Sequence, residues 1–267
     1  MPPPAHVLAA FGTSAEAQPL GGGQGTSWRS GELVLKPVDP AMSPEELEWQ
    51  GKVLDAVRED GFRVTRLRRA LDGAVLVDGW CAWGYVEGTH EERRWADVLE
   101  AGERFHAALA REPRPAHLDA RTDHWAIGDR VAWGELSAAR FAHVKHLPTL
   151  MAALRPLDAP SQLVHGDLTG NVLFATGLPP AVIDFSPYWR PQAFASAVVV
   201  GDALAWEGAD ERLLDAVAHI PSFPQFLLRA LVYRIVVDAL FREGDAPRPD
   251  DDDCFLAPVV LACRIAS

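Results

Sequence analysis

Two short stretches in the second half of the chain constrain its fold more than any other feature. The first, residues 165–174, reads HGDLTGNVLF, and the second, residues 182–191, reads VIDFSPYWRP. Each contains an apolar, strand-like run, and the turn between the runs holds a glycine and a proline pair, so we expect a hairpin. That hairpin would bring Asn171 and Asp184 to the same end of the ladder, where their oxygens could share a divalent cation. Asp167 would lie beside them on the preceding loop, as a base and not as a ligand.

A glycine-rich segment near the N-terminus precedes a strand that carries a lysine. Residues 20–27 read LGGGQGTS, and four glycines in five positions let the backbone turn tightly and bring N–H groups near a phosphate. The strand predicted at 33–38 follows, and Lys36 is the charged residue of an otherwise apolar run, which favours a paired lysine. The segment is not a Walker A loop, because no Gly-Lys-Ser/Thr opens a helix.

Strand patterns dominate before residue 88 and helical patterns dominate after it, which predicts an α+β fold. We expect a helix at 5–12 and another from Ser43 to about Arg58, with Ser43 as the N-cap. Two strands, Phe62–Leu67 and Ala74–Val77, are predicted to pair across Asp72-Gly73, and an apolar stretch follows at Trp80–Trp83. Later helices are predicted at 97–111, 137–154 (broken or kinked at Pro148), 194–206, 224–243 and 255–263.

The HGD tripeptide, the Asn171 position and the 13-residue step from Asn171 to Asp184 together resemble the protein-kinase-like superfamily. The resemblance is closest to its aminoglycoside phosphotransferase (APH) type, which has HGD where protein kinases have HRD. One departure matters: three residues separate Asp167 from Asn171, where the family pattern has four. The shortening could move the Asn171 side chain, so Asp184 is the more secure of the two metal ligands.

The resemblance implies a bilobal fold, with a small antiparallel-sheet N-lobe at residues 1–88 ending in the hinge, and a larger, mostly helical C-lobe at 89–267. It implies ATP and Mg²⁺ as cofactors, Asp167 as the catalytic residue, and Asn171 and Asp184 as metal ligands. Lys36 would contact the phosphates and be held by Glu48, with Glu46 as the alternative. Backbone groups of the hinge would pair with adenine. The residues implied for the nucleotide are Gly22, Gly23, Gly25, Thr26, Lys36, Glu48, Gly84 and Val86.

Three further residues have structural interpretations. The resemblance places His165 under the catalytic loop, and it places Asp202 where related folds often have a helical carboxylate that braces this loop. His106, on the helix predicted at 97–111, is interpreted as structural and not catalytic.

Composition limits the partners. The formal charge of −12 argues against nucleic acid, whose phosphates would be repelled. No apolar run approaches the roughly 18 residues that span a bilayer, so we expect no membrane segment. The N-terminal sequence MPPPAH does not resemble a signal peptide. The three scattered cysteines form neither a metal pattern nor a disulfide framework, which suits a cytoplasmic protein.

The predicted activity is ATP-dependent transfer of a phosphate to a hydroxyl of a small polar molecule, such as a sugar, an aminoglycoside-like compound or an amino alcohol. Aromatic side chains suit a sugar face, and carboxylates suit hydroxyls or amines. The substrate candidates are Trp189, Trp206, Glu207 and Asp210. Two alternatives stay open. A protein kinase of the same fold is disfavoured because no Ala-Pro-Glu sequence follows Asp184, and a pseudokinase acting through a partner is favoured only by the shortened Asp167–Asn171 spacing.

Overall fold

The computed structural model describes residues 1–21, 25–40, 42–243 and 253–267, and the predicted nucleotide residues Gly22 and Gly23 lie outside these ranges. The chain divides into two compact units. The first contains residues 1–91, 107–112 and 170–185, and the second contains 92–106, 113–169 and 186–267. The division predicted after residue 88 stays a prediction.

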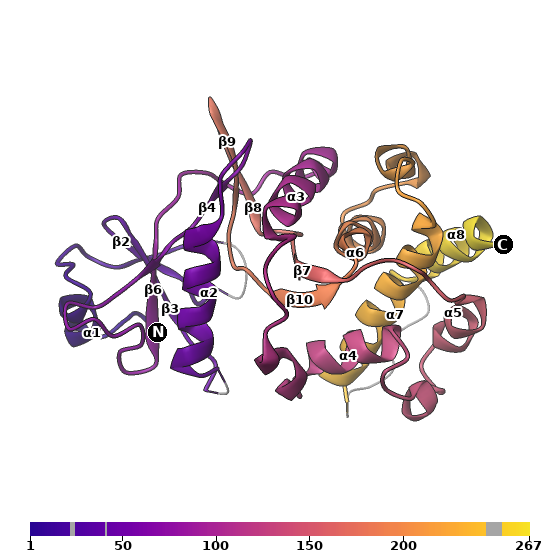
Figure 1. The fold of residues 1–267 in the computed structure, drawn as a ribbon, viewed down its shortest axis with the longest axis horizontal. Helices are drawn as coiled ribbons and strands as arrows, with labels where there is room; N and C mark the ends of the chain where they lie inside the picture. The colour runs from indigo at the N-terminus through magenta and orange to yellow at the C-terminus, as the bar shows by residue number, and fades with distance from the viewer. Residues whose placement is uncertain (22–24, 41, 244–252) are drawn as a thin grey trace. The chain divides into compact units, whose positions relative to one another are not determined.

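An antiparallel sheet in the strand order β1-β2-β3-β6-β5 forms the centre of the first unit (Figure 1). Neighbouring residues of a strand point to opposite faces, and the two faces carry different helices. On one face Leu35 and Ala82 pack with Val7 of α1, and on the other Cys81 packs with Leu47 of α2. The elements are α1 (Ala5–Ala10), β1 (Gln18–Pro19), β2 (Trp28–Ser30), β3 (Leu33–Pro37), α2 (Pro44–Ala56), β5 (Leu67–Arg68) and β6 (Trp80–Gly84).

The helix signals of the first unit are confirmed. Ser43 caps α2, because its Oγ accepts a hydrogen bond from the Glu46 N–H at 3.1 Å and Pro44 occupies the first turn. Helix α1 ends before Gly12, whose φ of +71° is the left-handed conformation that glycine adopts without strain.

A second, three-stranded sheet in the first unit has the order β4-β9-β8. Strands β8 (Val172–Ala175) and β9 (Leu178–Val182) form the predicted antiparallel hairpin, and β4 (Arg63–Val64) adds to β9 in parallel. Because β4 pairs with β9, this hairpin belongs to the first unit although it follows the HGD segment in sequence.

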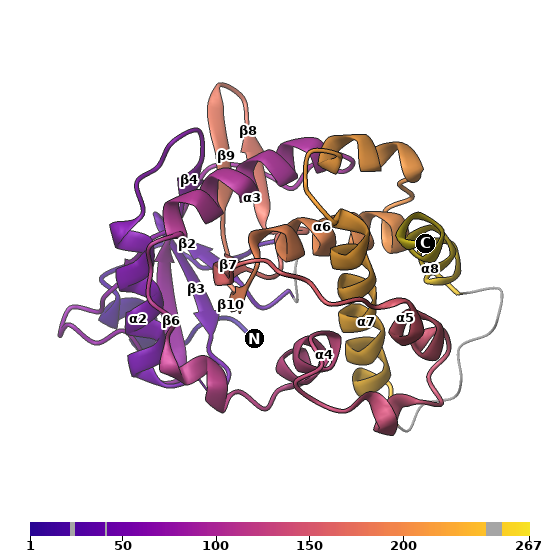
Figure 2. The same cartoon turned by 45° about the vertical axis from the view of Figure 1, so that its right-hand side comes forward.

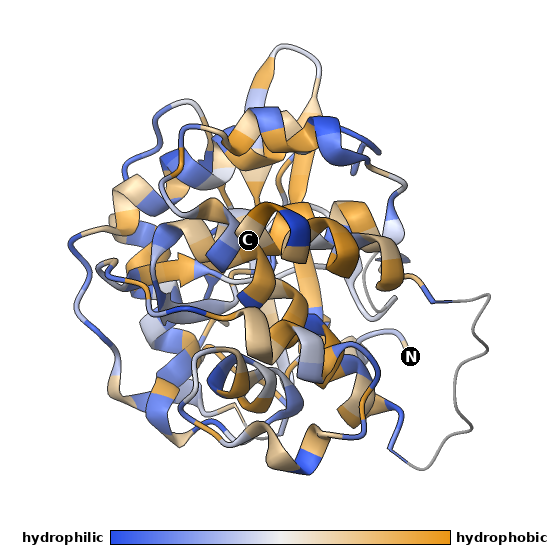
Figure 3. Ribbon diagram, turned by 90° about the vertical axis from the view of Figure 1, so that its right-hand side faces the viewer, coloured by the Kyte–Doolittle hydropathy of each residue, from blue (hydrophilic) through white to orange (hydrophobic). Residues whose placement is uncertain are grey.

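The second unit is largely helical and is built around α7. Figure 2 shows α4, α5, α6 and α8 packed about this helix, and the contacts agree. Helices α6 and α7 are buried over most of their length, and the helices facing the viewer in Figure 3 are coloured mostly as hydrophobic. The helical elements from residue 95 onward are α3 (Trp95–Leu109), η1 (Ala116–Ala120), α4 (His124–Ala132), η2 (Ala138–Phe141), α5 (Leu147–Ala153), α6 (Gln192–Trp206), η3 (Glu211–Val217), α7 (Phe223–Phe241) and α8 (Leu256–Ala266).

A two-stranded antiparallel sheet completes this unit. Strand β7 (Gln162–His165) leads into the HGD segment, and β10 (Pro187–Arg190) pairs with it, with Pro187 opposite His165. The segment that ends in His165 and the segment that begins after Ser186 are therefore held together by a backbone ladder.

The strands predicted at 62–67 and 74–77 are wrong in detail. The strand predicted at 62–67 is split into β4 and β5, which belong to different sheets, and 74–77 forms no strand beyond a single bridge between Val77 and Trp80. The helix predicted at 137–154 is broken before Pro148, as expected: η2 lies before the break, and Pro148 occupies the first turn of α5.

The fold class is as predicted, α+β with an N-terminal antiparallel sheet and a largely helical C-terminal part. Within the described ranges, no helix has both the length and the apolar character needed to cross a bilayer.

Candidate active site

The β8–β9 hairpin brings the two predicted metal ligands close together in the first unit. Val172 lies opposite Val182, and the Ile183 N–H donates to the Asn171 carbonyl at 3.0 Å. Asn171 and Asp184 therefore occupy the same end of the ladder, as the sequence predicted. Gly170, at φ +76°, makes the turn that leads directly into Asn171.

Asp184 has an unusual backbone conformation and a cationic partner. Its φ of +51° lies in the left-handed region, which is uncommon outside glycine and often marks functional positions. Its Oδ1 forms an ion pair with Lys36 Nζ. Lys36 lies opposite Cys81 in the β3–β6 ladder and so faces the α2 side of the sheet. The predicted paired lysine is thus present, with Asp184 as its partner.

The predicted pair between Lys36 and Glu48 is absent from the structure. Glu48 Oε1 instead accepts a hydrogen bond from Arg69 Nη1 at 3.0 Å. Arg69 also donates to the Gly73 carbonyl, so the turn after β5 holds a guanidinium against the exposed side of α2. The sequence pattern of α2 did not show that a second cation would compete for this glutamate.

One of the two predicted hinge residues is unsuitable for adenine. The Gly84 N–H donates to the Arg66 carbonyl at 2.8 Å, and the Gly84 carbonyl accepts from Thr65 Oγ1 at 2.7 Å, because this glycine still belongs to the sheet. By contrast, neither backbone group of Val86 has a hydrogen-bond partner among the residues that the structure describes. The next residue is fixed, since Arg63 donates to the Glu87 carbonyl at 2.8 Å.

The glycine-rich segment connects β1 to β2, as the predicted strand–turn–strand order requires. The Leu20 N–H donates to the Ser27 carbonyl at 2.9 Å and closes the base of this connection. Gly25 has a φ of +67°, and Thr26 is exposed. The nucleotide roles of Gly25 and Thr26 stay predictions.

The donor set at the hairpin end suits magnesium. Asn171 and Asp184 offer hard oxygen atoms, which Mg²⁺ prefers, and this ion usually takes only one or two protein ligands together with waters and substrate phosphates. Asn171 and Asp184 therefore fit a magnesium ion that is also bound by a nucleoside triphosphate.

In the second unit, two histidines hold the backbone that leads to Asp167. His165 is fully buried, and its Nδ1 accepts hydrogen bonds from the N–H groups of Asp167 at 3.2 Å and Ser186 at 3.4 Å. His106 Nε2 accepts from the His165 N–H at 3.0 Å. Burial lowers the pKa of His106 to about 3, so this ring is neutral at ordinary pH and serves as an acceptor. Both histidines therefore have the structural roles that were expected.

The carboxylate of Asp167 is held by a buried arginine from α7. Arg234 Nη2 donates to Asp167 Oδ1 at 2.8 Å. The same guanidinium binds both oxygens of Asp202, at 2.7 Å from Nε and 2.5 Å from Nη2. Burial raises the pKa of Asp202, and the charge of Arg234 opposes that shift. Asp202 thus braces the loop that carries Asp167, as expected, but it does so through Arg234.

Three of the predicted substrate residues, Trp206, Glu207 and Asp210, lie close together in the sequence between the end of α6 and the start of η3. Trp206 is half-exposed, and its ring centroid lies 5.8 Å from the Arg234 guanidinium carbon. The Glu207 carboxylate accepts a hydrogen bond from the indole of Trp95. Asp210 caps η3 and pairs with Arg212 at 2.5 Å. Of these three, Trp206 is thus the one placed beside the residue that holds Asp167.

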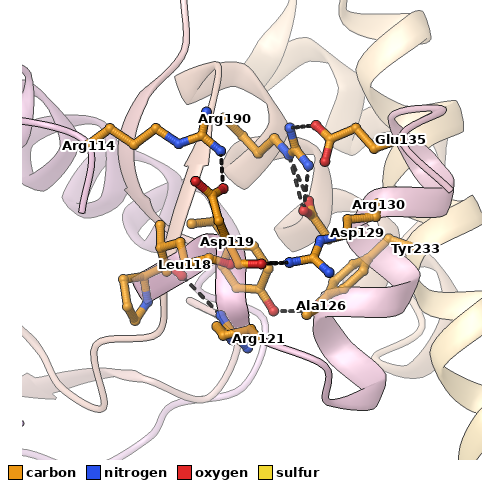
Figure 4. Close-up of polar contacts among 12 residues, drawn as sticks. Arg114, Leu118, Asp119, Arg121, Ala126, Asp129, Arg130, Glu135, Arg190 and Tyr233 are labelled. Atoms are coloured by element: carbon orange, nitrogen blue, oxygen red, sulfur yellow. Dashed lines mark hydrogen bonds and ion pairs between the residues drawn. The ribbon is translucent and has the colours of Figure 1, made fainter. Parts of the chain in front are cut away.

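The fourth predicted substrate residue, Trp189, lines a separate cavity that Figure 4 shows in part. Arg190 also lines it, with a two-pronged contact to Asp129 and a 2.5 Å contact to Glu135. Arg130 donates to backbone carbonyls of η1. The cavity volume of about 40 Å³ admits a few waters, at roughly 10–15 Å³ each. Such a small, charge-paired space suits a structural network better than a sugar-sized substrate, and the role of Trp189 stays a prediction.

Sequence reasoning missed Arg234 and its neighbour Trp125, whose ring lies 5.6 Å from the guanidinium carbon. A signal for Arg234 was present. It lies in the middle of an apolar helix, and a buried guanidinium requires a carboxylate partner. The partner, Asp202, is 32 residues away on another helix, so the sequence alone did not identify the pair.

Comparisons with known proteins identify the fold. Solved structures with the same fold include a microcompartment-associated aminopropanol kinase (18% identity, TM-score 0.63, covering 98% of this chain and 94% of that one). They also include an aminoglycoside phosphotransferase from Alicyclobacillus acidocaldarius (17%, 0.61, 100% and 95%) and spectinomycin phosphotransferase APH(9)-Ia in complex with ADP and spectinomycin (15%, 0.56, 98% and 95%). At these identities the likeness shows the fold alone, the kinase-like fold of small phosphotransferases.

The model of the phosphotransferase enzyme family, APH, matches residues 16–188, which is more than half of the chain. The chain therefore belongs to the APH phosphotransferase family. A search of curated proteins finds no match.

Proposed function

We propose that this protein transfers the γ-phosphate of ATP to a hydroxyl group of a small polar molecule. The observation that carries the proposal is the convergence of Lys36, Asp184 and Asn171 at one end of the β8–β9 hairpin. A cation for the phosphates and two oxygen donors for a metal are the groups that phosphoryl transfer requires. Enzymes that transfer phosphate accelerate the reaction by positioning the reactants and by neutralising charge on the phosphates. The protein takes little part in covalent chemistry.

In this proposal Lys36 contacts the phosphates that are not transferred, and Asp184, with Asn171, holds magnesium. The ion, when bound, neutralises charge on the β- and γ-phosphate oxygens. Gly25 and Thr26 lie against the phosphates, and the open backbone groups of Val86 bind the edge of adenine. Gly84 is not part of this set, since its N–H is already used within the sheet.

Asp167 orients the acceptor hydroxyl and accepts its proton. As that proton leaves, the acceptor oxygen bonds to the γ-phosphorus, the bond between that phosphorus and the β,γ-bridging oxygen breaks, and ADP departs. The ion pair with Arg234 supports this role because it fixes one carboxylate oxygen and leaves the side chain 39% exposed, within reach of a substrate.

A small acceptor is supported by the fold relatives, whose names refer to aminopropanol, aminoglycosides and spectinomycin. The formal charge of −12 disfavours nucleic acid and anionic lipid as acceptors. Trp206 supports a hydroxylated molecule with an apolar face, because its half-exposed ring adjoins Arg234.

The test is transfer of labelled γ-phosphate from Mg-ATP to a library of sugars, polyols, amino alcohols and aminoglycosides, with the purified full chain. We expect transfer to at least one member and none to duplex DNA or anionic lipid vesicles. Clean phosphorylation of a lipid or nucleic acid, without activity on the small molecules, would refute the proposal.

A pseudokinase that binds nucleotide and acts through a partner is the second candidate, favoured by the shortened Asp167–Asn171 spacing. Asn171→Ala tests whether the shortened loop still brings this side chain to the metal. If Asn171 reaches the metal, we expect activity to fall steeply and to recover partly with added magnesium. An enzyme unaffected by this substitution shows that the shortened loop has withdrawn the ligand. Mg-ATP binding without transfer to any acceptor favours the pseudokinase.

A further inference from the structure

The guanidinium of Arg234 contacts two carboxylates through different edges. Nε and Nη2 hold the two oxygens of Asp202, so Asp202 occupies the edge that these nitrogens share. The guanidinium is a planar fork, and the second N–H of Nη2 points to the edge shared with Nη1. Asp167 Oδ1, which accepts from Nη2, therefore lies at the Nη1–Nη2 edge.

At that edge Nη1 is an open donor beside the catalytic carboxylate. Nη1 has no hydrogen-bond partner within the ranges that the structure describes. The Asp202 side of the guanidinium is closed, with that side chain 1% exposed, whereas Asp167 is 39% exposed. The Arg234 side chain is itself 7% exposed, and its Nη1 edge adjoins the more exposed carboxylate of the pair, the one that would receive the substrate proton.

Packing holds this donor in place. The guanidinium carbon of Arg234 lies 5.6 Å from the Trp125 ring, 5.8 Å from the Trp206 ring and 5.1 Å from the Tyr233 ring. These three aromatic contacts and the two hydrogen bonds to Asp202 leave the Arg234 side chain little rotamer freedom. A substrate oxygen that binds Nη1 therefore meets a donor that is already oriented, and the half-exposed Trp206 ring offers an apolar surface beside it.

We propose that Arg234 determines acceptor specificity, and that the acceptor is a neutral polyol whose reacting hydroxyl has a second hydroxyl on the neighbouring carbon. This inference rests on the proposed phosphotransferase function and narrows its substrate class. The reacting hydroxyl gives its proton to Asp167 while its oxygen bonds to the γ-phosphorus and the bond to ADP breaks. The neighbouring hydroxyl accepts a hydrogen bond from Arg234 Nη1 and is chemically unchanged.

The same geometry selects against amino alcohols with the amine at the neighbouring position. An ammonium group has only donors, so it cannot accept from Nη1, and it would lie against the positive guanidinium. Loss of a hydrogen bond to a charged group, with that group left unpaired, corresponds to roughly 10- to 100-fold in kcat/KM.

Three matched pairs of acceptors test the inference with the full chain and Mg-ATP. Each pair differs in one group: glycerol and 2-amino-1,3-propanediol, trans-1,2-cyclohexanediol and trans-2-aminocyclohexanol, and 1,2-propanediol and 1-amino-2-propanol. We expect the hydroxyl member to have the higher kcat/KM in each pair that reacts, by roughly 10- to 100-fold.

Two variants assign this preference to one side chain. Arg234→Lys keeps a positive charge near Asp202 but lacks the fork, so we expect the preference to fall below about threefold while Mg-ATP affinity is unchanged. Arg130→Lys is the matched control, since Arg130 is a helical arginine of the same unit that donates to the Leu118 and Asp119 carbonyls. It should keep the wild-type preference.

Equal or better kcat/KM for the amino members would overturn the inference, and so would an unchanged preference in Arg234→Lys. If Arg234→Lys shows no thermal unfolding transition, the variant is not folded. The inference is then judged by the wild-type ratio of kcat/KM between the hydroxyl and amino members. Absence of transfer to all six compounds also overturns it. In that case calorimetry with Mg-ATP distinguishes failure of the polyol inference from failure of the proposed function. If Mg-ATP binds, only the polyol inference fails. If Mg-ATP does not bind, the proposed phosphotransferase function fails as well.

Discussion

At the scale of single residues, Asp184 combines a left-handed backbone with an ion pair to Lys36. Asparagine tolerates the same φ but carries no charge, so Asp184→Asn isolates the carboxylate from the backbone effect. We expect weaker Mg-dependent ATP binding by calorimetry and loss of turnover, because an amide is a poor magnesium ligand in place of a carboxylate.

Asp78→Asn is the control for that substitution. Asp78 also belongs to the first unit and also has a positive φ, of 47°, but it lies at the surface and pairs with His6. It should leave nucleotide binding and turnover unchanged. Full turnover in Asp184→Asn would remove Asp184 from the metal site.

Some pairings between single residues could be predicted from the sequence and others could not. Asn171 and Asp184 were placed together from the sequence because their spacing along the chain is short, whereas the roles of Lys36 and Asp167 were taken from a family resemblance and stay predictions. Glu48 was assigned wrongly because its actual partner depends on a turn 21 residues away. Such pairings depend on tertiary structure, which helix periodicity does not encode.

At the scale of elements, His106 connects α3 to the strand that precedes the catalytic loop. Its pKa is lowered from 6.5 to about 3 by burial, so the folded state binds fewer protons than the unfolded state between these values. The free energy of unfolding should therefore fall as pH drops through this window, by at most about 1.4 kcal/mol per pH unit. Denaturant titrations at a series of pH values measure this slope.

His106→Gln should flatten that acid-side slope, because an amide oxygen can accept from the His165 N–H but does not titrate over this range. His106→Leu should lower the free energy of unfolding by about 1–3 kcal/mol at neutral pH, since it leaves that N–H without an acceptor. His219→Gln, at a side chain 60% exposed, should keep the wild-type slope. An unchanged slope in His106→Gln would contradict the assigned neutral ring.

The close packing of α4 on α7 leads us to expect that a larger side chain at Gly128 destabilises the fold. A Cβ at Gly128 would lie 2.9 Å from the Tyr233 carbonyl and 2.6 Å from a Val237 methyl, so Gly128→Ala should destabilise the fold, by roughly 1–3 kcal/mol. Gly201→Ala is the matched control, because the nearest atoms lie at 3.7 Å or more. It should be neutral or should stabilise by up to about 1 kcal/mol through helix propensity. Equal thermal shifts for the two variants would contradict the packing.

Element prediction from sequence was accurate where local signals agree. The capped α2, the hairpin of β8 and β9, and the long α7 were all predicted, since caps, turns and periodicity are local. It was wrong over 62–77, where short β4 pairs with a strand more than 100 residues away. Pairing over that distance has no signature in the sequence of β4 itself.

At the scale of the whole molecule, the segregation of strands before residue 88 and helices after it predicted the fold class, and the family comparison agrees with it. The proposed nucleotide should stabilise the folded chain. Mg-ATP at 100 times its Kd should stabilise the native state by about 2.7 kcal/mol, which raises Tm in a concentration-dependent way. ATP without magnesium should give a smaller shift, and no shift with either Mg-ATP or Mg-GTP would contradict a nucleotide site.

In the proposed mechanism Asp167 serves the transferring hydroxyl and not the nucleotide, and Asp167→Asn separates these two roles. Asparagine can still accept a hydrogen bond from Arg234, so the loop should keep its structure. On an acceptor that the wild type phosphorylates, kcat should fall by about 10²–10⁴-fold, while the Kd for Mg-ATP measured by calorimetry stays nearly unchanged. Full kcat in Asp167→Asn would contradict the assignment of this loop as the catalytic centre.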